Sequence, residues 1–187
     1  MEFFPELELG WLNGWLPLAV FYLVFGVMVA VFPRPVVERL YDLPKFKGWM
    51  KLVARVGRMI AVFVVMGLLI YSPLKVGEPV FVIGGIVYLL GLVGMVWALI
   101  TYRQTPLDQP VVAGLYRYSR HPQVVGLMLV FLGSCLAVGS WLLVLGWLVM
   151  ACINHLRTVA EEQLCLAQYG DSYQAYMEKV ARYFIFF

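Results

Sequence analysis

Charged residues are scarce in this chain of 187 residues, and their scarcity excludes an ordinary soluble domain. Only 13% of the residues are Asp, Glu, Lys or Arg and 63% are hydrophobic, whereas soluble domains carry about 25% charged residues. Four stretches contain no Asp, Glu, Lys, Arg or His: residues 9–33, 59–74, 79–102 and 122–154. The first and third, of 25 and 24 residues, exceed the ~20 residues that a helix needs to cross a bilayer. The sequence therefore predicts an all-α integral membrane protein.

Cysteine and histidine are also rare. The chain has three cysteines, two histidines, no Cys-x-x-Cys and no Cys/His cluster, so we expect neither a disulfide framework nor a metal site. Cys135 and Cys152 lie in apolar stretches, where we expect them to pack as small hydrophobic side chains, and Cys165 lies in the C-terminal tail. The net charge of +3 is small and reflects membrane orientation, so we expect no nucleic-acid partner. An acidic N-terminus argues against a secretory signal.

The apolar stretches predict five transmembrane helices, at about 14–32, 56–73 and 79–101 and in a hairpin at 123–155. The last stretch has 33 residues and would be roughly 50 Å long as one helix, so we expect two short helices that separate near Gly139-Ser140. Lys and Arg number seven in the first loop, one in the second, three in the third, none at the hairpin tip and three in the tail. This alternation predicts an external N-terminus and a cytoplasmic C-terminus.

The connections between these spans carry further signals. We expect residues 34–58 to form a basic cytosolic connection with a helix on the membrane surface, and residues 102–121 to form a Pro-rich loop. Small-residue pairs, Gly26 with Ala30 and Gly94 with Ala98, indicate close helix packing within the monomer or across a dimer. We expect a single domain, 1–187, made of a three-span part, 1–101, and a part with the loop, hairpin and tail, 102–187.

The tail divides at Gly170. We expect the second arm of the hairpin to continue as a helix through residues 156–169 and to end at that glycine. Asp171 is the predicted N-cap of a last helix. Its residues Tyr173, Tyr176, Met177 and Val180 fall on one face, which we expect to pack against the bundle or the membrane interface.

Two polar clusters interrupt the apolar C-terminal half. The first comprises Arg117, Arg120, His121 and Pro122, and the free N–H groups of the helix that starts at Pro122 could hold an anion. The second comprises Arg157, Glu161 and Glu162. Taken alone, His121 reads as a polar residue at the membrane interface, and Arg157 with Glu161 as a surface ion pair. Two such clusters at one membrane face instead indicate a site.

The spacing of these clusters resembles a known superfamily. The chain reads Gly-x-Tyr-Arg-Tyr-x-Arg-His-Pro from Gly114, then a hydrophobic hairpin, then Arg-x3-Glu-Glu-x3-Leu-x2-Tyr-Gly-x2-Tyr-x2-Tyr from Arg157. Both segments resemble the isoprenylcysteine carboxyl methyltransferases and phospholipid methyltransferases, over residues 114–184. The closing Arg182-Tyr183-Phe184 is similar to the Arg-Phe that ends this family's motif.

The resemblance implies S-adenosylmethionine as cofactor, bound at the cytosolic end of the bundle, and a lipid-like or prenylated acceptor that enters from the bilayer. It implies cofactor contacts from both motifs and catalytic roles for Arg157, Glu161 and Arg182. The residues that it places at the cofactor are Tyr116, Arg120, His121, Pro122, Glu161, Glu162, Tyr169 and Tyr173. A carboxylate acceptor would need only orientation, by Arg157 or Arg182, whereas an amine acceptor would need a base such as a glutamate or His121.

The chain departs from the family pattern at two places. Val124 stands where the family often has Tyr, two residues after His-Pro. The Gly-x-Gly that marks the phospholipid branch is absent, which favours the isoprenylcysteine-like branch over phospholipid N-methylation. Two alternatives stay open: an NADPH-dependent enzyme like the membrane sterol reductases, which share a related hairpin and tail, and a non-catalytic relative, for which Val124 is the support.

Overall fold

The computed structural model describes residues 1–41 and 56–184, and these residues form seven α-helices and one 3-10 helix. Charge-free stretches and their flanking prolines and glycines set most helix ends. The helices are α1 (Trp15–Val31), α2 (Arg34–Tyr41), α4 (Arg58–Tyr71), α5 (Pro79–Gln104), η2 (Gly114–Arg117), α6 (Pro122–Val138), α7 (Trp141–Tyr169) and α8 (Asp171–Lys179). The expected all-helical fold is confirmed for the described residues.

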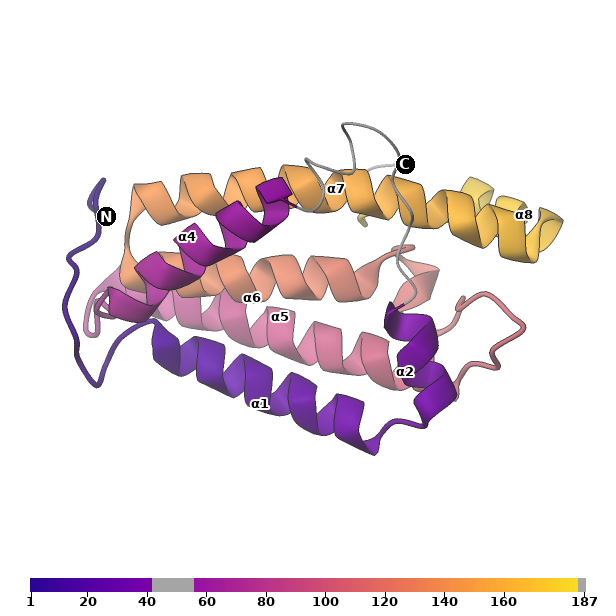
Figure 1. Ribbon diagram of the computed structural model, residues 1–187, viewed down its shortest axis with the longest axis horizontal. Coiled ribbons are helices and arrows are strands. Elements are labelled where there is room, and N and C mark those ends of the chain that lie inside the picture. The colour runs from indigo at the N-terminus through magenta and orange to yellow at the C-terminus, as the bar shows by residue number, and fades with distance from the viewer. Residues whose placement is uncertain (42–55, 185–187) are drawn as a thin grey trace.

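The five long helices run alternately up and down the bundle (Figure 1). The predicted break of the C-terminal hairpin is confirmed, because α6 ends at Val138 and α7 begins at Trp141. Gly139 has φ +75°, which glycine adopts without strain. The hydroxyl of Ser140 then accepts a hydrogen bond from the amide of Leu143 at 3.5 Å and caps α7.

Helices α5 and α6 pack backbone to backbone through glycines. A Cβ added at Gly91 would lie 2.6 Å from the amide nitrogen of Val130, and one added at Gly126 would lie 2.9 Å from the carbonyl oxygen of Gly91. Gly84 and Gly133 make a second close approach of the same kind. The small-residue pairs, which we expected to pack within the monomer or across a dimer, pack only in part within this bundle. Ala98 is fully buried, whereas no atom lies within 4 Å of a Cβ at Gly94 or Gly26.

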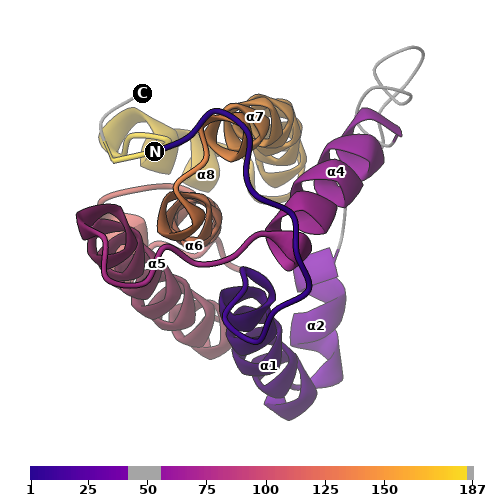
Figure 2. The same ribbon diagram turned by 90° about the vertical axis from the view of Figure 1, so that its left-hand side faces the viewer.

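The N-terminal segment lies as a strap across one end of the bundle (Figures 1 and 2). Its backbone pairs with both nearby turns: the amide of Glu2 donates to the carbonyl of Gly139 at 2.8 Å, and the amide of Trp141 donates to Glu2 at 2.9 Å. The amide of Glu8 donates to the carbonyl of Tyr71, also at 2.8 Å. These hydrogen bonds connect the C-terminal ends of α4 and α6 through the N-terminal segment. The segment thereby covers the end of the bundle that is remote from the polar motifs.

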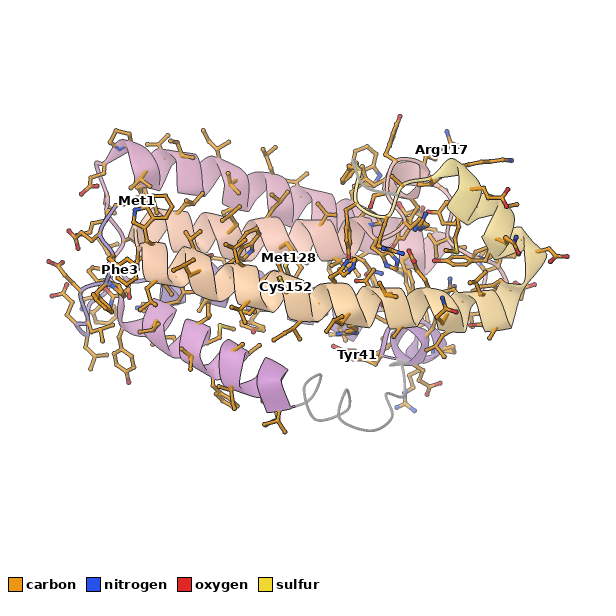
Figure 3. The ribbon with its side chains drawn as sticks, turned by 90° about the horizontal axis from the view of Figure 1, so that it is seen from above. Met1, Phe3, Tyr41, Arg117, Met128 and Cys152 are labelled. Carbon is orange, nitrogen blue, oxygen red and sulfur yellow. The ribbon has the colours of Figure 1, made fainter. Side chains whose placement is uncertain are left out.

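The other end carries both polar motifs. Figure 3 shows Arg117 and Tyr41 at this end, Met1 and Phe3 at the opposite end, and Met128 and Cys152 between them. The expected connection contains a helix, α2, whose position on the membrane surface remains a prediction, and the rest of that connection, residues 42–55, lies outside the described residues. The side chain of Cys135 is buried and packs as expected, whereas that of Cys152 is exposed on the surface of the described bundle.

The predicted division of the tail at Gly170 is confirmed, because α7 runs to Tyr169 and α8 folds back against it. Tyr173, Tyr176 and Val180 pack together on α7, as their spacing predicts. The predicted cap is wrong by one residue. Gly170, with φ +53°, is the N-cap, and Asp171 is already the first helical residue, because only glycine accommodates the sharp reversal between the helices.

Length and hydropathy favour a membrane location. Helices α5 and α7 are long and apolar enough to cross a bilayer, and three shorter apolar helices, Trp15–Val31, Met59–Tyr71 and Pro122–Val138, lie beside them. Leu23, Phe63 and Leu90 leave large apolar surfaces on the outside of the bundle, which fits contact with lipid rather than water. Five full crossings remain a prediction.

Candidate active site

A buried ion-pair cluster joins the loop before α6 to α7 and to the C-terminal segment. The carboxylate of Glu162, 1% exposed, accepts a hydrogen bond from Arg120 Nε at 2.8 Å and one from Arg182 Nη2 at 2.7 Å. His121 Nε2 lies 3.3 Å from the Glu162 Oε1 atom. Such charge-assisted bonds are among the strongest in proteins. Residues 120, 162 and 182, far apart in the sequence, therefore meet at one point.

The charge of Glu162 is maintained by these partners. Burial alone would raise the pKa of the Glu162 carboxyl group, but hydrogen bonds from His121, Arg182 and Arg120 outweigh burial and hold this pKa well below its usual range. The carboxylate is therefore ionised at neutral pH. Because its oxygens are already bonded to cationic side chains, Glu162 acts in this structure as a clamp between segments.

Arg120 also holds the C-terminal segment through the backbone. Its Nη1 atom donates to the carbonyl oxygens of Met177, at 3.0 Å, and Val180, at 2.6 Å. Its own amide donates to the carbonyl of Ala181 at 2.9 Å, and the neighbouring Ser119 hydroxyl donates to the carbonyl of Arg182 at 2.8 Å. The predicted proximity of the two polar motifs is thereby confirmed.

A small polar and aromatic pocket lies beside this cluster, with a volume of about 90 Å³. Its walls come from α2, α5, the loop before α6, the first turn of α6, the C-terminal half of α7, and α8. Burial raises the pKa of Tyr173 and of Tyr176, so both phenols are neutral donors at physiological pH. The lining residues are Arg39, Tyr102, Pro110, Val111, Tyr116, Arg120, His121, Gln123, Glu161, Leu164, Cys165, Gln168, Tyr169, Tyr173 and Tyr176.

Tyr116, which lines this pocket, carries a buried hydroxyl group without a hydrogen-bond partner among the described residues. The side chain is 4% exposed. The backbone carbonyl of Tyr116 is satisfied by the Tyr176 hydroxyl at 2.6 Å, so only the side-chain group is left over. A buried, unpaired hydroxyl costs about 1–3 kcal/mol, and a bound molecule with a polar atom at this position would remove that cost.

A larger, mostly apolar pocket of about 530 Å³ lies deeper in the bundle. Its apolar walls come from α1, α2, α4, α5, α6 and α7, and its polar groups gather at the end near the small pocket. Several lining side chains, including Tyr22 and Phe63, are exposed on the outside of the bundle, so the pocket opens laterally. The lining residues are Phe21, Tyr22, Phe25, Leu40, Tyr41, Met59, Val62, Phe63, Met95, Leu99, Gln123, Val124, Leu127, Phe131, Met150, Asn154, Arg157, Thr158 and Glu161.

The two pockets share a wall. Gln123, in the first turn of α6, and Glu161, on α7, line both of them. A group bound in the small pocket and a head group bound in the large pocket would therefore meet at these two side chains. This juxtaposition can bring two reactants together away from bulk water.

One comparison with known proteins identifies the family. The sequence model described as phospholipid methyltransferase matches residues 76–172, just over half of the chain. The chain belongs to the phospholipid methyltransferase family. No curated protein matches the chain significantly. Membership makes this chain a methyltransferase of a lipid-like substrate, and the apolar helices α5 and α7 fit the membrane location of the family.

The residues that the sequence singled out for methyl transfer occupy three different places. Most of the residues expected at the cofactor line the small pocket, and Arg157 lines the large one. Pro122, Glu162 and Arg182 line neither of these two pockets. Pro122 starts α6, whereas Glu162 and Arg182 pair with each other. The predicted residues in the small pocket are Tyr116, Arg120, His121, Glu161, Tyr169 and Tyr173.

The first turn of α6 has fewer free N–H groups to bind an anion than its sequence suggested. The amides of Val124 and Val125 both donate to the carbonyl of His121, at 3.0 and 3.1 Å, and Pro122 has no N–H to give. An anion site of several free N–H groups is therefore not supported. Val124, which replaces the family tyrosine, lines the large pocket rather than the small one.

The sequence patterns did not point to Arg39, Tyr102 and Gln123, which are among the residues that line these pockets. Arg39 and Tyr102 line the small pocket and Gln123 lines both pockets. In the sequence, Arg39 was only one of the loop charges that predict the orientation of the chain in the membrane. Tyr102 was only the last residue of an apolar stretch. Of these residues, only Gln123 could have been found from the sequence, because it directly follows His121-Pro122. Within residues 1–41 and 56–184, no group of three His, Cys, Asp or Glu side chains could hold a metal ion.

Proposed function

We propose that this protein is an S-adenosylmethionine-dependent methyltransferase that acts on a lipid-like acceptor at the cytosolic end of a five-span bundle. The observation that carries the proposal is the shared wall of Gln123 and Glu161 between a polar, aromatic pocket and a larger apolar one. Two pockets of different polarity suit two reactants of different polarity.

The chemistry of the small pocket fits this cofactor. Tyr116, Tyr169 and Tyr173 offer aromatic faces and hydroxyls to an adenosine group, and the unpartnered hydroxyl of Tyr116 offers a donor. The carboxylate of Glu161 suits ribose hydroxyls or a cationic group. The pocket volume, about 90 Å³, is below the ~300–1,000 Å³ of typical ligand pockets. The bound cofactor would therefore extend past Glu161 into the polar end of the large pocket.

The large pocket fits a hydrophobic acceptor. Its apolar walls reach the lateral surface where α1 and α4, which meet near the N-terminal strap, diverge towards α2 (Figures 1 and 2). An acceptor chain could enter there without crossing water. Its head group would then lie near Arg157, Asn154 and Glu161, at the boundary with the small pocket.

Two acceptor classes have specific support. The Arg157 guanidinium at the polar end favours an acceptor carboxylate, as in the isoprenylcysteine-like reaction, which needs no base. Glu161 on the shared wall favours an amine, as in phospholipid N-methylation, because a carboxylate there can take the proton that the amine loses. When bound, the cofactor supplies an electrophilic methyl group, and the chain's own residues position the reactants and exclude water.

Cofactor binding is tested by calorimetry on purified protein in detergent. We expect Tyr116→Phe, which removes only the unpartnered hydroxyl, to weaken S-adenosylmethionine binding about two- to tenfold. The matched control is Tyr118→Phe, because Tyr118 lies in the same loop but is 66% exposed, and it should bind like the wild type. No binding by the wild type at millimolar cofactor would reject the proposal, and stabilisation by NADPH alone would support a reductase instead.

The acceptor is tested by transfer of a labelled methyl group into prenylcysteine analogues and into phosphatidylethanolamine. With the cofactor kept saturating for each variant, transfer into the carboxylate substrate that is lost in Arg157→Gln but retained in Glu161→Gln supports the isoprenylcysteine-like reaction. Transfer into the amine, lost in Glu161→Gln, supports phospholipid N-methylation. Turnover of neither substrate by protein that binds the cofactor would reject both acceptor classes.

A further inference from the structure

Helix α2 contributes a cation to the small pocket from outside the residues that match the family. Arg39 lies in the last turn of α2 and lines that pocket, whereas the family match begins at residue 76. Neither polar motif therefore accounts for its position. The contacts of the Arg39 guanidinium indicate its role.

The guanidinium of Arg39 holds the loop that follows α5. Its Nη1 atom donates to the carbonyl oxygen of Pro106 at 3.0 Å and its Nη2 atom donates to that of Gln109 at 3.2 Å. The same group lies over the ring of Tyr102, 4.6 Å from the centroid. Two donors of one planar fork thus bind two carbonyls while an aromatic face fixes the plane.

That loop is a wall of the small pocket. Pro110 and Val111, directly after Gln109, both line it. On its other side the loop is held by the hydroxyl of Tyr169, which donates to the carbonyl of Leu107 at 3.4 Å. The loop's own backbone adds one long bond, from the amide of Gln109 to the carbonyl of Pro106 at 3.4 Å. Its position therefore depends on side chains that reach it from α2 and α7.

We propose that Arg39 is a positioning residue for cofactor binding, which latches the loop at residues 106–111 against α5 and so shapes the wall of the small pocket. This inference rests on the proposed function, because it takes the small pocket as the cofactor site. Since α2 is the expected surface helix, the latch also links the membrane-facing helix to the pocket.

Arg39 holds the loop through the planar geometry of its guanidinium, with its two fixed donors, rather than through its charge. Lysine keeps the charge, but its single ammonium does not reproduce two fixed donors and a planar group stacked on Tyr102. We therefore expect both Arg39→Ala and Arg39→Lys to raise the cofactor Kd and KM about five- to tenfold. The kcat at saturating cofactor should stay within about twofold of the wild type, because Arg39 acts on binding.

Arg103→Ala is the matched control. Arg103 lies in the last turn of α5 and also stacks on an aromatic ring, that of Phe32 at 5.5 Å, but it does not line the small pocket. We expect this variant to bind the cofactor like the wild type. Equal binding by the wild type and Arg39→Ala would overturn the proposal, and so would full recovery of binding in Arg39→Lys.

Hydrogen exchange of the loop gives a readout that needs no cofactor. Amides of residues 105–113 should exchange faster in Arg39→Ala and Arg39→Lys than in the wild type and Arg103→Ala. Unchanged exchange would overturn the latch. If the wild type does not bind S-adenosylmethionine, the proposed function fails; if the wild type and Arg39→Ala bind it equally, only the role of Arg39 fails.

Discussion

Adjacent carboxylates at positions 161 and 162 have different environments. Successive residues of an α-helix point about 100° apart, so Glu162 turns into the cationic cluster while Glu161 turns to the wall between the pockets. The sequence identified both residues from their charge in an apolar setting. From the sequence, both were expected at the cofactor. Only the rotation of α7 against its neighbours decides that Glu162 joins the ion-pair cluster and that Glu161 lines the pockets.

Loss of the Glu162 charge should destabilise the fold. Glu162→Gln leaves Arg120 buried without its counter-ion, and removal of one partner from a buried pair costs about 3–5 kcal/mol. Glu161→Gln is the matched control and should change the free energy of unfolding by about 0.5 kcal/mol or less. Denaturant unfolding in detergent measures both. Equal destabilisation by the two variants would contradict the assignment of Glu162 as the clamp.

The Glu162 cluster also predicts a pH dependence of stability. Because the folded pKa lies below the ordinary value of 4.5, the contribution of Glu162 is complete above about pH 4.5 and is lost as the pH falls through the folded pKa. The stability difference between the wild type and Glu162→Gln should therefore be constant from pH 7 to pH 5 and shrink in stronger acid. A difference that shrinks between pH 7 and pH 6 would contradict this cause.

At the scale of elements, the hairpin and its neighbours follow from local signals. Pro79 and Pro122 each start a helix, Gly139 ends α6, and Ser140 caps α7, and each of these signals is readable in the sequence. It was harder to predict from the sequence which face of each helix packs against its neighbour. Gly94 looked like a packing position, yet Gly84 and Gly91 make the close contacts with α6, because contact depends on how the two helices are rotated towards each other.

Glycine substitutions on α5 test this packing. Gly91→Ala places a Cβ 2.6 Å from the amide nitrogen of Val130 and 2.7 Å from the carbonyl oxygen of Gly126. Overpacking of this kind costs about 1–3 kcal/mol, so the melting temperature in detergent should fall. Gly94→Ala meets no atom within 4 Å and should be neutral or slightly stabilising. A larger loss in Gly94→Ala would show that α5 is rotated differently.

At the scale of the whole molecule, the bundle separates a site end from a strap end. The N-terminal segment closes one end, while α2, the loop before α6 and α8 lie at the other (Figures 1 and 3), where their residues line the small pocket. The alternation of Lys and Arg in the loops predicts that the site end faces the cytoplasm. The cofactor pocket would then open to the compartment where the cofactor is dissolved.

Cysteine labelling tests that orientation. In a background without the three native cysteines, Leu9→Cys on the strap should react with an impermeant maleimide in intact cells, because Leu9 is 87% exposed. Lys179→Cys at the end of α8 should react only after permeabilisation. Labelling of both positions from the same side would contradict an odd number of crossings.

The sequence by itself determined the class of the molecule, its hairpin and the two motifs, because uncharged stretches, helix breakers and charge in an apolar setting are local properties of the chain. Only the tertiary structure decided that Glu162 is a clamp, that Gln123 and Glu161 divide two pockets, and that Arg39 reaches the loop after α5. These facts depend on helix rotation and on distances between segments remote in sequence, which no local pattern encodes.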